Sequence, residues 1–302
     1  MLDDVIGYLR CPQCASGHSG NSALRRVGAA LCCRAGHSFD IARSGYVNLL
    51  PGGLSAGSGD TAPMVAARQD FLSGGHYEGL ASALADVAAP GCAPGGCVIE
   101  LGAGTGYYLA AVLDRLPGVA GLALDLSKSA LKVAARSHPR AGAVGCDAWR
   151  GLPVADGAAG LVLSVFAPRD GPEFRRVLRD TGRLIVVAPA ADHLAELIEL
   201  LGLLTVDPRK EDRLAAKLGP YFEVAAASEY RARLDLGHTA VSSLAAMGPG
   251  SWHADAETLA ERVAHLPNPT EVNVAVTITS YRPRPTPPAP PTCPGQIRPT
   301  LS

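Results

Sequence analysis

Three glycines at alternate positions lie where a short apolar run meets a helical pattern. They are Gly102, Gly104 and Gly106, and the apolar run before them covers residues 97–101. A strand that turns this tightly into a helix brings bare backbone and a helix N-terminus against a ligand, and a Cβ in the turn would hold that ligand off. The third glycine of the dinucleotide fingerprint G-x-G-x-x-G is missing at either register. The turn therefore predicts a bound nucleoside cofactor other than a dinucleotide.

A carboxylate follows the next apolar run. Asp125 closes the run 119–124 and stands where a ribose-binding acid belongs in folds of this kind. The alternative is an Asp that caps the helix expected to begin after it. A strand, a glycine turn, a helix and a second strand that ends in Asp together favour the cofactor site.

Four residues near the N-terminus have the spacing of a zinc site. Cys11 and Cys14 form a C-x₂-C knuckle, and Cys33 and His37 follow with C-x₃-H spacing. Two such pairs on tight turns can close a tetrahedron around Zn²⁺, and a site closed by four protein ligands is structural. So short a segment has little apolar surface of its own, so we expect the metal to supply its folding energy. Reduced cysteines without a metal are the alternative.

Two neighbouring residues offer other ligand sets. Cys32 could replace Cys33 with C-x₄-H spacing, but it would point the other way if residues 30–33 form a strand. His18 lies inside the loop and is the weaker histidine candidate.

Composition sets broad limits on the protein class. The chain has 302 residues, 47% of them hydrophobic, and a net charge of −1, so an RNA partner would have to meet a local basic patch. No apolar run approaches the roughly 20 residues that span a bilayer, and the acidic N-terminus does not resemble a signal peptide. We therefore expect a cytoplasmic protein without a membrane partner, in which clustered cysteines bind metal rather than form disulfides.

Short apolar strands alternate with helical patterns from residue 97 on. Strands are expected at 97–101, 119–124, 142–146, 159–165 and 183–188, with helices at 105–116, 127–137, 172–179 and 191–202. This alternation predicts an α/β fold with a parallel sheet covered on both faces, and a ligand crevice at the carboxyl ends of the strands where the strand order reverses. Further on we expect helices at 209–218 and 255–266 and a hairpin-like pair of strands at 221–236 and 271–281.

The chain divides into four parts by composition. We expect a zinc-binding module at 1–50, a linker and helix at 51–76, the α/β domain at 77–282 and a disordered, proline-rich tail at 283–302. Arginines give the first part a basic face that either binds RNA or is only solvated; they are Arg10, Arg25, Arg26, Arg34 and Arg43.

Several segments together resemble a known family. Besides the zinc knuckle and the glycine turn, they are 36–50, 59–68, 71–77, 124–128, 166–169 and 193–197. The sequence Glu-x-Gly-x-Gly-x-Gly resembles motif I of S-adenosylmethionine-dependent methyltransferases. The joint pattern, over about residues 5–282, resembles the zinc-containing 23S rRNA guanine-N1 methyltransferases of the RlmA type. Within that family it is most similar to the actinomycete branch that confers resistance to tylosin- and mycinamicin-type macrolides.

The resemblance implies a Rossmann-like class I methyltransferase with a small N-terminal zinc-binding module, using S-adenosylmethionine and a structural Zn²⁺. The backbone cradle for the methionine portion of the cofactor would then be formed by Gly102, Gly104, Thr105 and Gly106. Asp125 would bind the ribose hydroxyls. Asp147 would accept from the adenine amino group or only cap a helix. Tyr77 and His193 match positions that contact the cofactor in the family, although by sequence alone they suit a packed aromatic and a residue at a helix start.

The chemistry implied is methyl transfer to N1 of a guanine in a 23S rRNA hairpin. N1 carries a proton at neutral pH and lies on the Watson–Crick edge, so the base must be unpaired or extruded and the proton must leave. No general base is implied, and Arg169, Asp170 and His193 are unranked candidates. Trp252 could stack on the base or be a buried structural residue.

Two other functions fit parts of the pattern. A methyltransferase for a small metabolite leaves the zinc knuckle without a role, and a non-catalytic zinc-dependent RNA-binding protein leaves the intact glycines unexplained. The leading prediction is a macrolide-resistance rRNA methyltransferase with 23S rRNA as its partner. The oligomeric state stays open, with a homodimer as one candidate.

Overall fold

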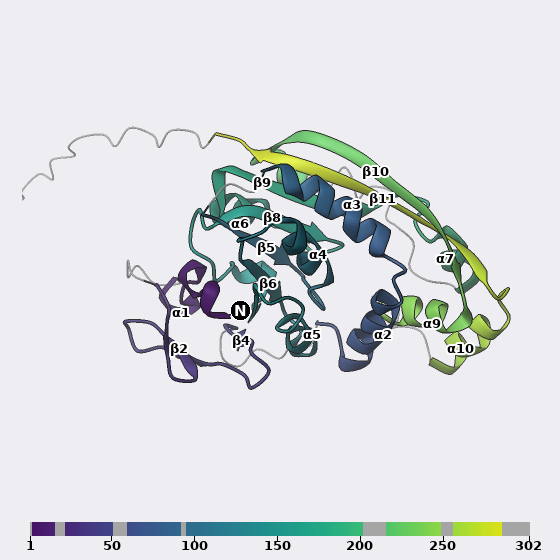
Figure 1. Ribbon diagram of the computed structural model, residues 1–302, viewed down its shortest axis with the longest axis horizontal. Coiled ribbons are helices and arrows are strands. Elements are labelled where there is room, and N and C mark those ends of the chain that lie inside the picture. Colours follow the sequence, from purple (N-terminus) through teal and green to yellow (C-terminus); the bar gives the residue numbers. More distant parts are fainter. Residues whose placement is uncertain are drawn as a thin grey trace, which may run out of the picture.

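A computed structural model describes residues 2–15, 22–50, 59–91, 95–201, 216–248 and 256–285. The described chain forms an eight-stranded mixed sheet with helices packed against it and a small three-stranded sheet near the N-terminus (Figure 1). Residues 51–58 of the predicted linker, most of the predicted helix at 209–218, Trp252 and the tail from 286 on lie outside the described residues.

The order of the strands in the large sheet confirms the predicted α/β class. The order is β10-β11-β9-β8-β5-β6-β7-β4. The bounds are β4 (Val47–Asn48), β5 (Cys97–Leu101), β6 (Gly121–Asp125), β7 (Ala141–Gly145), β8 (Ala159–Val165), β9 (Leu178–Pro189), β10 (Phe222–Leu236) and β11 (Thr270–Pro283). Strand β5 pairs in parallel with both β6 and β8, so the chain order reverses between β5 and β8. The long strands β10 and β11 form the predicted antiparallel pair.

The central strands are mostly apolar because both faces of the sheet are buried; Glu100 in β5 and Ser164 in β8 are buried polar exceptions. Every residue of β5, β7 and β8 is buried. Successive residues enter different hydrophobic clusters: Val98 packs with the helices of one face, and Ile99 with the other face.

The helices have these bounds: α2 (Ala62–Ser73), α3 (Glu78–Ala88), α4 (Tyr107–Arg115), α5 (Lys128–Ala134), α6 (Gly171–Val177), α7 (Ala195–Leu201), α9 (His238–Ala246) and α10 (Ala256–Ala264). Thr61 caps α2 by accepting from the backbone N–H of Met64. Helix α9 was not expected from the sequence, and it packs beside α2 (Figure 1).

The first 50 residues share a core with the large sheet. They include η1 (Leu2–Asp4), η2 (Ile6–Tyr8), α1 (Pro12–Ala15), β1 (Arg25–Val27), β2 (Ala30–Cys32) and β3 (Ser38–Asp40). Strands β1 to β3 form the small antiparallel sheet, whereas β4 pairs in parallel with β7 at the edge of the large one. The apolar side chains of this segment join the cluster that also contains Ile99 and Phe174. The N-terminal segment thus covers part of one face of the sheet.

None of the described helices has the length and apolarity needed to cross a bilayer.

Candidate metal centre and cofactor crevice

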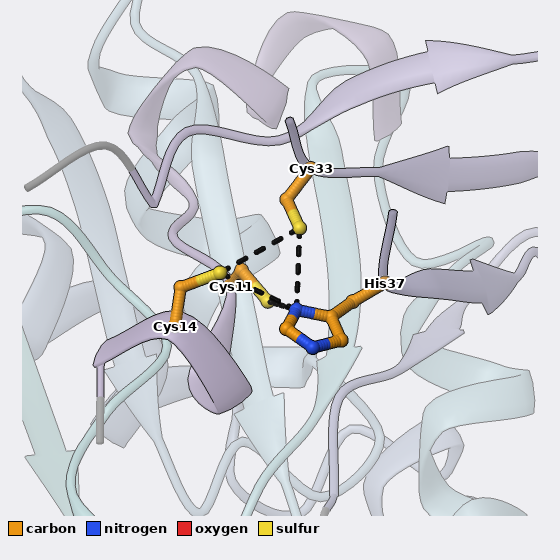
Figure 2. A group of neighbouring side chains, drawn as sticks. All are labelled: Cys11, Cys14, Cys33 and His37. Atoms are coloured by element: carbon orange, nitrogen blue, oxygen red, sulfur yellow. Dashed lines mark hydrogen bonds between the residues drawn. The ribbon is translucent and has the colours of Figure 1, made fainter. Parts of the chain in front are cut away.

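The four predicted zinc ligands meet in one cluster (Figure 2). The Nδ1 atom of His37 lies 3.5 Å from Sγ of Cys11 and 3.3 Å from Sγ of both Cys14 and Cys33. The Sγ atoms of Cys14 and Cys33 are 3.6 Å apart. Tetrahedral zinc with ordinary bond lengths separates its sulfur and nitrogen ligands by about 3.5–3.8 Å. Donor types and spacing therefore fit Zn²⁺ closed by four protein ligands.

Tight turns position these ligands and exclude the neighbouring thiol. Burial raises the pKa of Cys33, but hydrogen bonds from the backbone of His37 and Ala35 and from the neighbouring thiols outweigh it and lower that pKa. The Cys32 side chain instead donates to Oγ of Ser38 at 3.5 Å, outside the cluster. This alternation along β2 is the reason for preferring Cys33. The other candidate, His18, lies outside the described residues.

An ion-pair network joins the zinc-binding segment to the α/β sheet. The backbone N–H of Arg10 donates to the carbonyl of Pro153 at 3.0 Å. Its guanidinium lies 3.4 Å from the carboxylate of Asp156, which also pairs with Arg176 at 2.6 Å. Among the arginines of the predicted basic face, Arg10 therefore has a structural role, because it contacts Pro153 and Asp156.

The glycine turn forms at the carboxyl end of β5. Gly102, Gly104 and Gly106 all have positive φ, at 66°, 53° and 76°, which favours glycine. A Cβ at Gly102 would lie 2.7 Å from Cβ of Ala167, and one at Gly106 would lie 2.5 Å from Oγ of Ser137. The expectation that glycine is needed only to let a ligand approach is incomplete, because backbone conformation and close packing also require it. Thr105, between the last two glycines, is buried.

Asp125 holds the glycine turn to the end of β6. Its Oδ2 accepts from the backbone N–H of Gly104, and its Oδ1 from that of Ser127, both at 2.8 Å. The cap of α5 is Ser127, which accepts from the N–H of Ala130, so Asp125 does not have the helix-cap role. Burial raises the pKa of Asp125, although the two amide donors oppose this. The carboxylate thus lies at the carboxyl end of β6 against the turn that follows β5, where a ribose-binding acid is expected.

Glu100, the acid of the Glu-x-Gly-x-Gly-x-Gly sequence, lies in β5 just before the glycine turn. Only 1% of it is exposed, and its Oε2 accepts from the backbone N–H of Leu109 in the first turn of α4. Burial raises its pKa to about 8, with the N–H of Leu109 acting in the opposite direction. An acid inside an otherwise apolar strand was the available signal, since buried acids are rare without a specific partner.

Two further predicted cofactor contacts, Tyr77 and Asp147, have different settings in the structure. Tyr77 is buried at the start of α3 and packs edge-on against Phe71, with burial raising its pKa. Asp147 accepts from the backbone N–H of Trp149 at 3.0 Å, so it does cap a short 3₁₀ turn (η4, Ala148–Arg150). The contacts of both residues with a cofactor stay predictions.

His193 and Phe166 form a stacked pair after strands β9 and β8. Their ring centroids are 5.9 Å apart with an interplanar angle of 23°. His193 is 9% exposed, and its Nδ1 accepts from the backbone N–H of Ala275 at 3.2 Å. Phe166 is 41% exposed and has a φ of 53°, an unusual backbone conformation for an aromatic residue.

The structure separates the three candidates for a general base. Asp170 caps α6 by accepting from the N–H of Glu173. Arg169 is a cation whose pKa is lowered by burial, and an arginine does not lose its proton in proteins. His193 is the candidate with a titratable ring, and Nδ1 is its hydrogen-bond acceptor in this structure.

Comparisons with known proteins agree with this geometry. The family model described as the N-terminal part of RlmA matches residues 9–53. A protein of Micromonospora griseorubida assigned as a 23S rRNA (guanine-N1)-methyltransferase is 51% identical over 298 residues, covering 94% of this chain and all of that protein. The 23S rRNA (guanine(748)-N1)-methyltransferase of Streptomyces fradiae is 49% identical over 289 residues, with the same coverage. A Bacillus subtilis protein assigned to the same activity is 30% identical over 82% of this chain and 88% of its own length.

Proposed function

Because the chain belongs to the RlmA-type family of 23S rRNA guanine-N1 methyltransferases, we propose that it transfers the methyl group of S-adenosylmethionine to N1 of a guanine in 23S rRNA. The observation that carries the proposal is the meeting of the glycine turn and Asp125 at the carboxyl edge of the sheet, where the strand order reverses. In a sheet of this class I type, that edge binds the nucleoside cofactor.

Different predicted residues bind different parts of S-adenosylmethionine. The methionine portion lies on Gly102, Gly104, Thr105 and Gly106, the ribose on Asp125 and the adenine near Asp147. Tyr77 and His193 complete the contacts. When bound, the cofactor supplies a strongly electrophilic methyl group, and the protein's contribution is to place the nucleophile in line with it.

Phe166 is suited to hold the target base. Its ring is exposed on the loop after β8, and that loop touches the glycine turn through Ala167 and Gly102. A guanine extruded from its hairpin can stack on such a ring, which is worth roughly 1–3 kcal/mol per base. Phe166→Ala should then weaken RNA binding and turnover while leaving cofactor affinity unchanged, and Phe166→Tyr should restore both. Equal losses in the two variants would remove Phe166 from the base site.

The target and the biological role follow from the relatives. The Streptomyces fradiae relative is named for guanine 748, so the equivalent guanine is the proposed target. Methylation there would confer resistance to tylosin- and mycinamicin-type macrolides. Expression in a sensitive host should raise the inhibitory concentration of tylosin, and the Asp125→Ala variant should not.

The zinc-binding residues 1–50 serve, in this proposal, as the RNA-recognition module of a methyltransferase domain at 77–282. Arg25, Arg34 and Arg43 are exposed there and available for phosphate contacts. A ribosomal substrate implies a cytoplasmic location. A homodimer would show in the mass measured by light scattering.

The direct test is transfer of a labelled methyl group from S-adenosylmethionine. Purified enzyme is incubated with 23S rRNA fragments and, separately, with a small-molecule extract. Label in the rRNA supports the proposal. Label only in the extract would support the metabolite methyltransferase, and normal RNA binding without cofactor binding would support the non-catalytic RNA-binding protein.

A further inference from the structure

An arginine of α2 reaches the glycine turn from outside the α/β unit. Arg68 lies so close to Gly104 that a Cβ built there would be 3.2 Å from its Nη1 and 3.6 Å from its Cδ. The glycine turn follows β5, whereas Arg68 belongs to α2. This contact therefore brings a side chain from a distant part of the sequence to the proposed methionine cradle.

One nitrogen of the guanidinium is anchored and the others are available. Nη2 pairs with Oδ2 of Asp60 at 2.7 Å and donates to the carbonyl of Met247 at 2.9 Å. Nε is buried and has no hydrogen-bond partner. Within the described part of the chain, Nη1 donates to no acceptor either. A buried donor without an acceptor is unfavourable, so the site lacks a group that can accept from Arg68.

The charges around Arg68 indicate the chemistry of that group. Asp60 pairs with Arg68, and Asp125 is close enough for the positive charge of Arg68 to lower the pKa of its carboxyl group. A simple anion would meet these acids as well as the arginine. A zwitterion suits both, because its ammonium group can face the acids and its carboxylate can accept from the N–H groups of Nη1.

We propose that Arg68 binds the α-carboxylate of the cofactor's methionine portion, and that Asp60 and Met247 hold the guanidinium in place for it. The inference rests on the proposed function, because it takes S-adenosylmethionine as the ligand of the crevice. It adds α2 and the end of α9 to the cofactor site.

The alternative is a purely structural arginine that joins α2 to the glycine turn. Loss of such an arginine would weaken every ligand of the crevice alike. Loss of an arginine that binds a carboxylate lowers the affinity only for ligands that carry a carboxylate. Decarboxylated S-adenosylmethionine differs from the cofactor in that group alone.

Calorimetry with both compounds, without RNA, separates the two roles. For Arg68→Gln we expect roughly a 10- to 100-fold loss of affinity for S-adenosylmethionine and less than about a 3-fold change for the decarboxylated compound. Arg68→Lys, which keeps the charge but not the planar donors, should lose less. The matched control is Arg183→Gln, since Arg183 donates to the carbonyls of Val87 and Ala88 at the opposite edge of the sheet and should not affect either ligand.

Each other outcome overturns the inference. Equal losses for both compounds in Arg68→Gln and Arg68→Lys would show a structural arginine, and no loss for either would show that Arg68 does not contact the ligand. If the unmodified protein bound neither compound, the proposed function itself would fail and the inference with it. Thermal unfolding of each variant identifies any loss of the folded state, and Arg68→Lys then provides the comparison.

Discussion

The zinc cluster and the cofactor crevice are both built on short turns, but their polar atoms do different work. In the cluster, four ligand atoms from residues 11–37 face one another within 4.8 Å. In the crevice, the oxygens of Asp125 and Glu100 already accept from backbone N–H groups. The cluster's side chains therefore have one role, to bind metal. Both crevice acids shape the turn, and Asp125 is in addition the proposed acceptor for the ribose.

The largest effect should come from breaking the zinc cluster. Cys33→Ser removes one of the four ligands and should reduce bound zinc from about one ion per chain to none. The loss should also destabilise this segment, because structural zinc contributes on the order of 10 kcal/mol to the folding of small zinc-binding units. Cys32→Ser is the matched control, since its thiol contacts Ser38 instead, and it should keep its zinc. Elemental analysis measures the metal, and hydrogen exchange reports the order of β1 to β3. Full zinc in Cys33→Ser would contradict the assignment.

The next effect concerns Asp125. Asp125→Ala removes the proposed ribose acceptor and its hydrogen bonds to the backbone N–H groups of Gly104 and Ser127, so we expect cofactor affinity to fall by more than about 100-fold while RNA binding survives. Asp147→Ala should cost roughly 10-fold or less, because its proposed contact is limited to the adenine amino group and its other role is to cap a 3₁₀ turn. Calorimetry with S-adenosylhomocysteine measures both. Normal affinity in Asp125→Ala would show that the acid is not part of the cofactor site.

A smaller effect should appear in the pH dependence of stability. Burial raises the pKa of Glu100 from 4.5 to about 8, so between these values the folded chain holds a proton that the unfolded chain has lost. Stability then falls as pH rises through this window. Glu100→Gln has no such proton, so its free energy of unfolding should not fall in this way. Between pH 5 and pH 8 the difference in stability between the two proteins should shift in favour of the variant, by on the order of a few kcal/mol at most.

Glu173→Gln provides a control of opposite sign. Burial raises the pKa of Glu173, but bonds from Arg176 and Leu152 outweigh this and lower it. The ionised form therefore stabilises the fold above the unfolded pKa, so Glu173→Gln should lose stability at neutral pH. Thermal unfolding across the pH range measures both variants. A parallel response of the two would contradict the assigned environments.

The smallest effect should come from the contact between the zinc-binding segment and the α/β sheet. Arg10→Gln breaks the ion pair with Asp156, and Arg10 is 23% exposed, so we expect a loss of roughly 0.5–1 kcal/mol. Zinc content and cofactor affinity should not change. A loss of zinc in this variant would mean that the metal site depends on docking against the α/β sheet.

The two regions also differ in how far the sequence predicts them. The zinc ligands could be predicted because they lie in two short spacings, and the choice of Cys33 over Cys32 needed only strand alternation. The parallel sheet could be predicted because buried strands form continuous apolar runs. Strand β4 was missed because two residues carry no periodic signal, and α9 because its N-cap, Gly237, makes no side-chain cap.

Long-range contacts account for the rest. Whether Asp125 caps a helix or ties two loops depends on Gly104, which comes from another strand. The approach of Arg68 to the same glycine depends on how α2 packs, and its partners Asp60 and Met247 lie far apart in the chain. Such juxtapositions come from packing and not from local pattern, so only the structure reveals them.

Mapping of reverse-transcriptase stops on 23S rRNA tests the central claim most directly. A methyl group on N1 of guanine blocks Watson–Crick pairing, so treated rRNA should give a new stop next to one guanine, at the position equivalent to 748. The stop should require S-adenosylmethionine and should be absent with Asp125→Ala. An unchanged stop pattern in rRNA that has incorporated labelled methyl, or no label in rRNA at all, would contradict guanine-N1 methylation by this crevice.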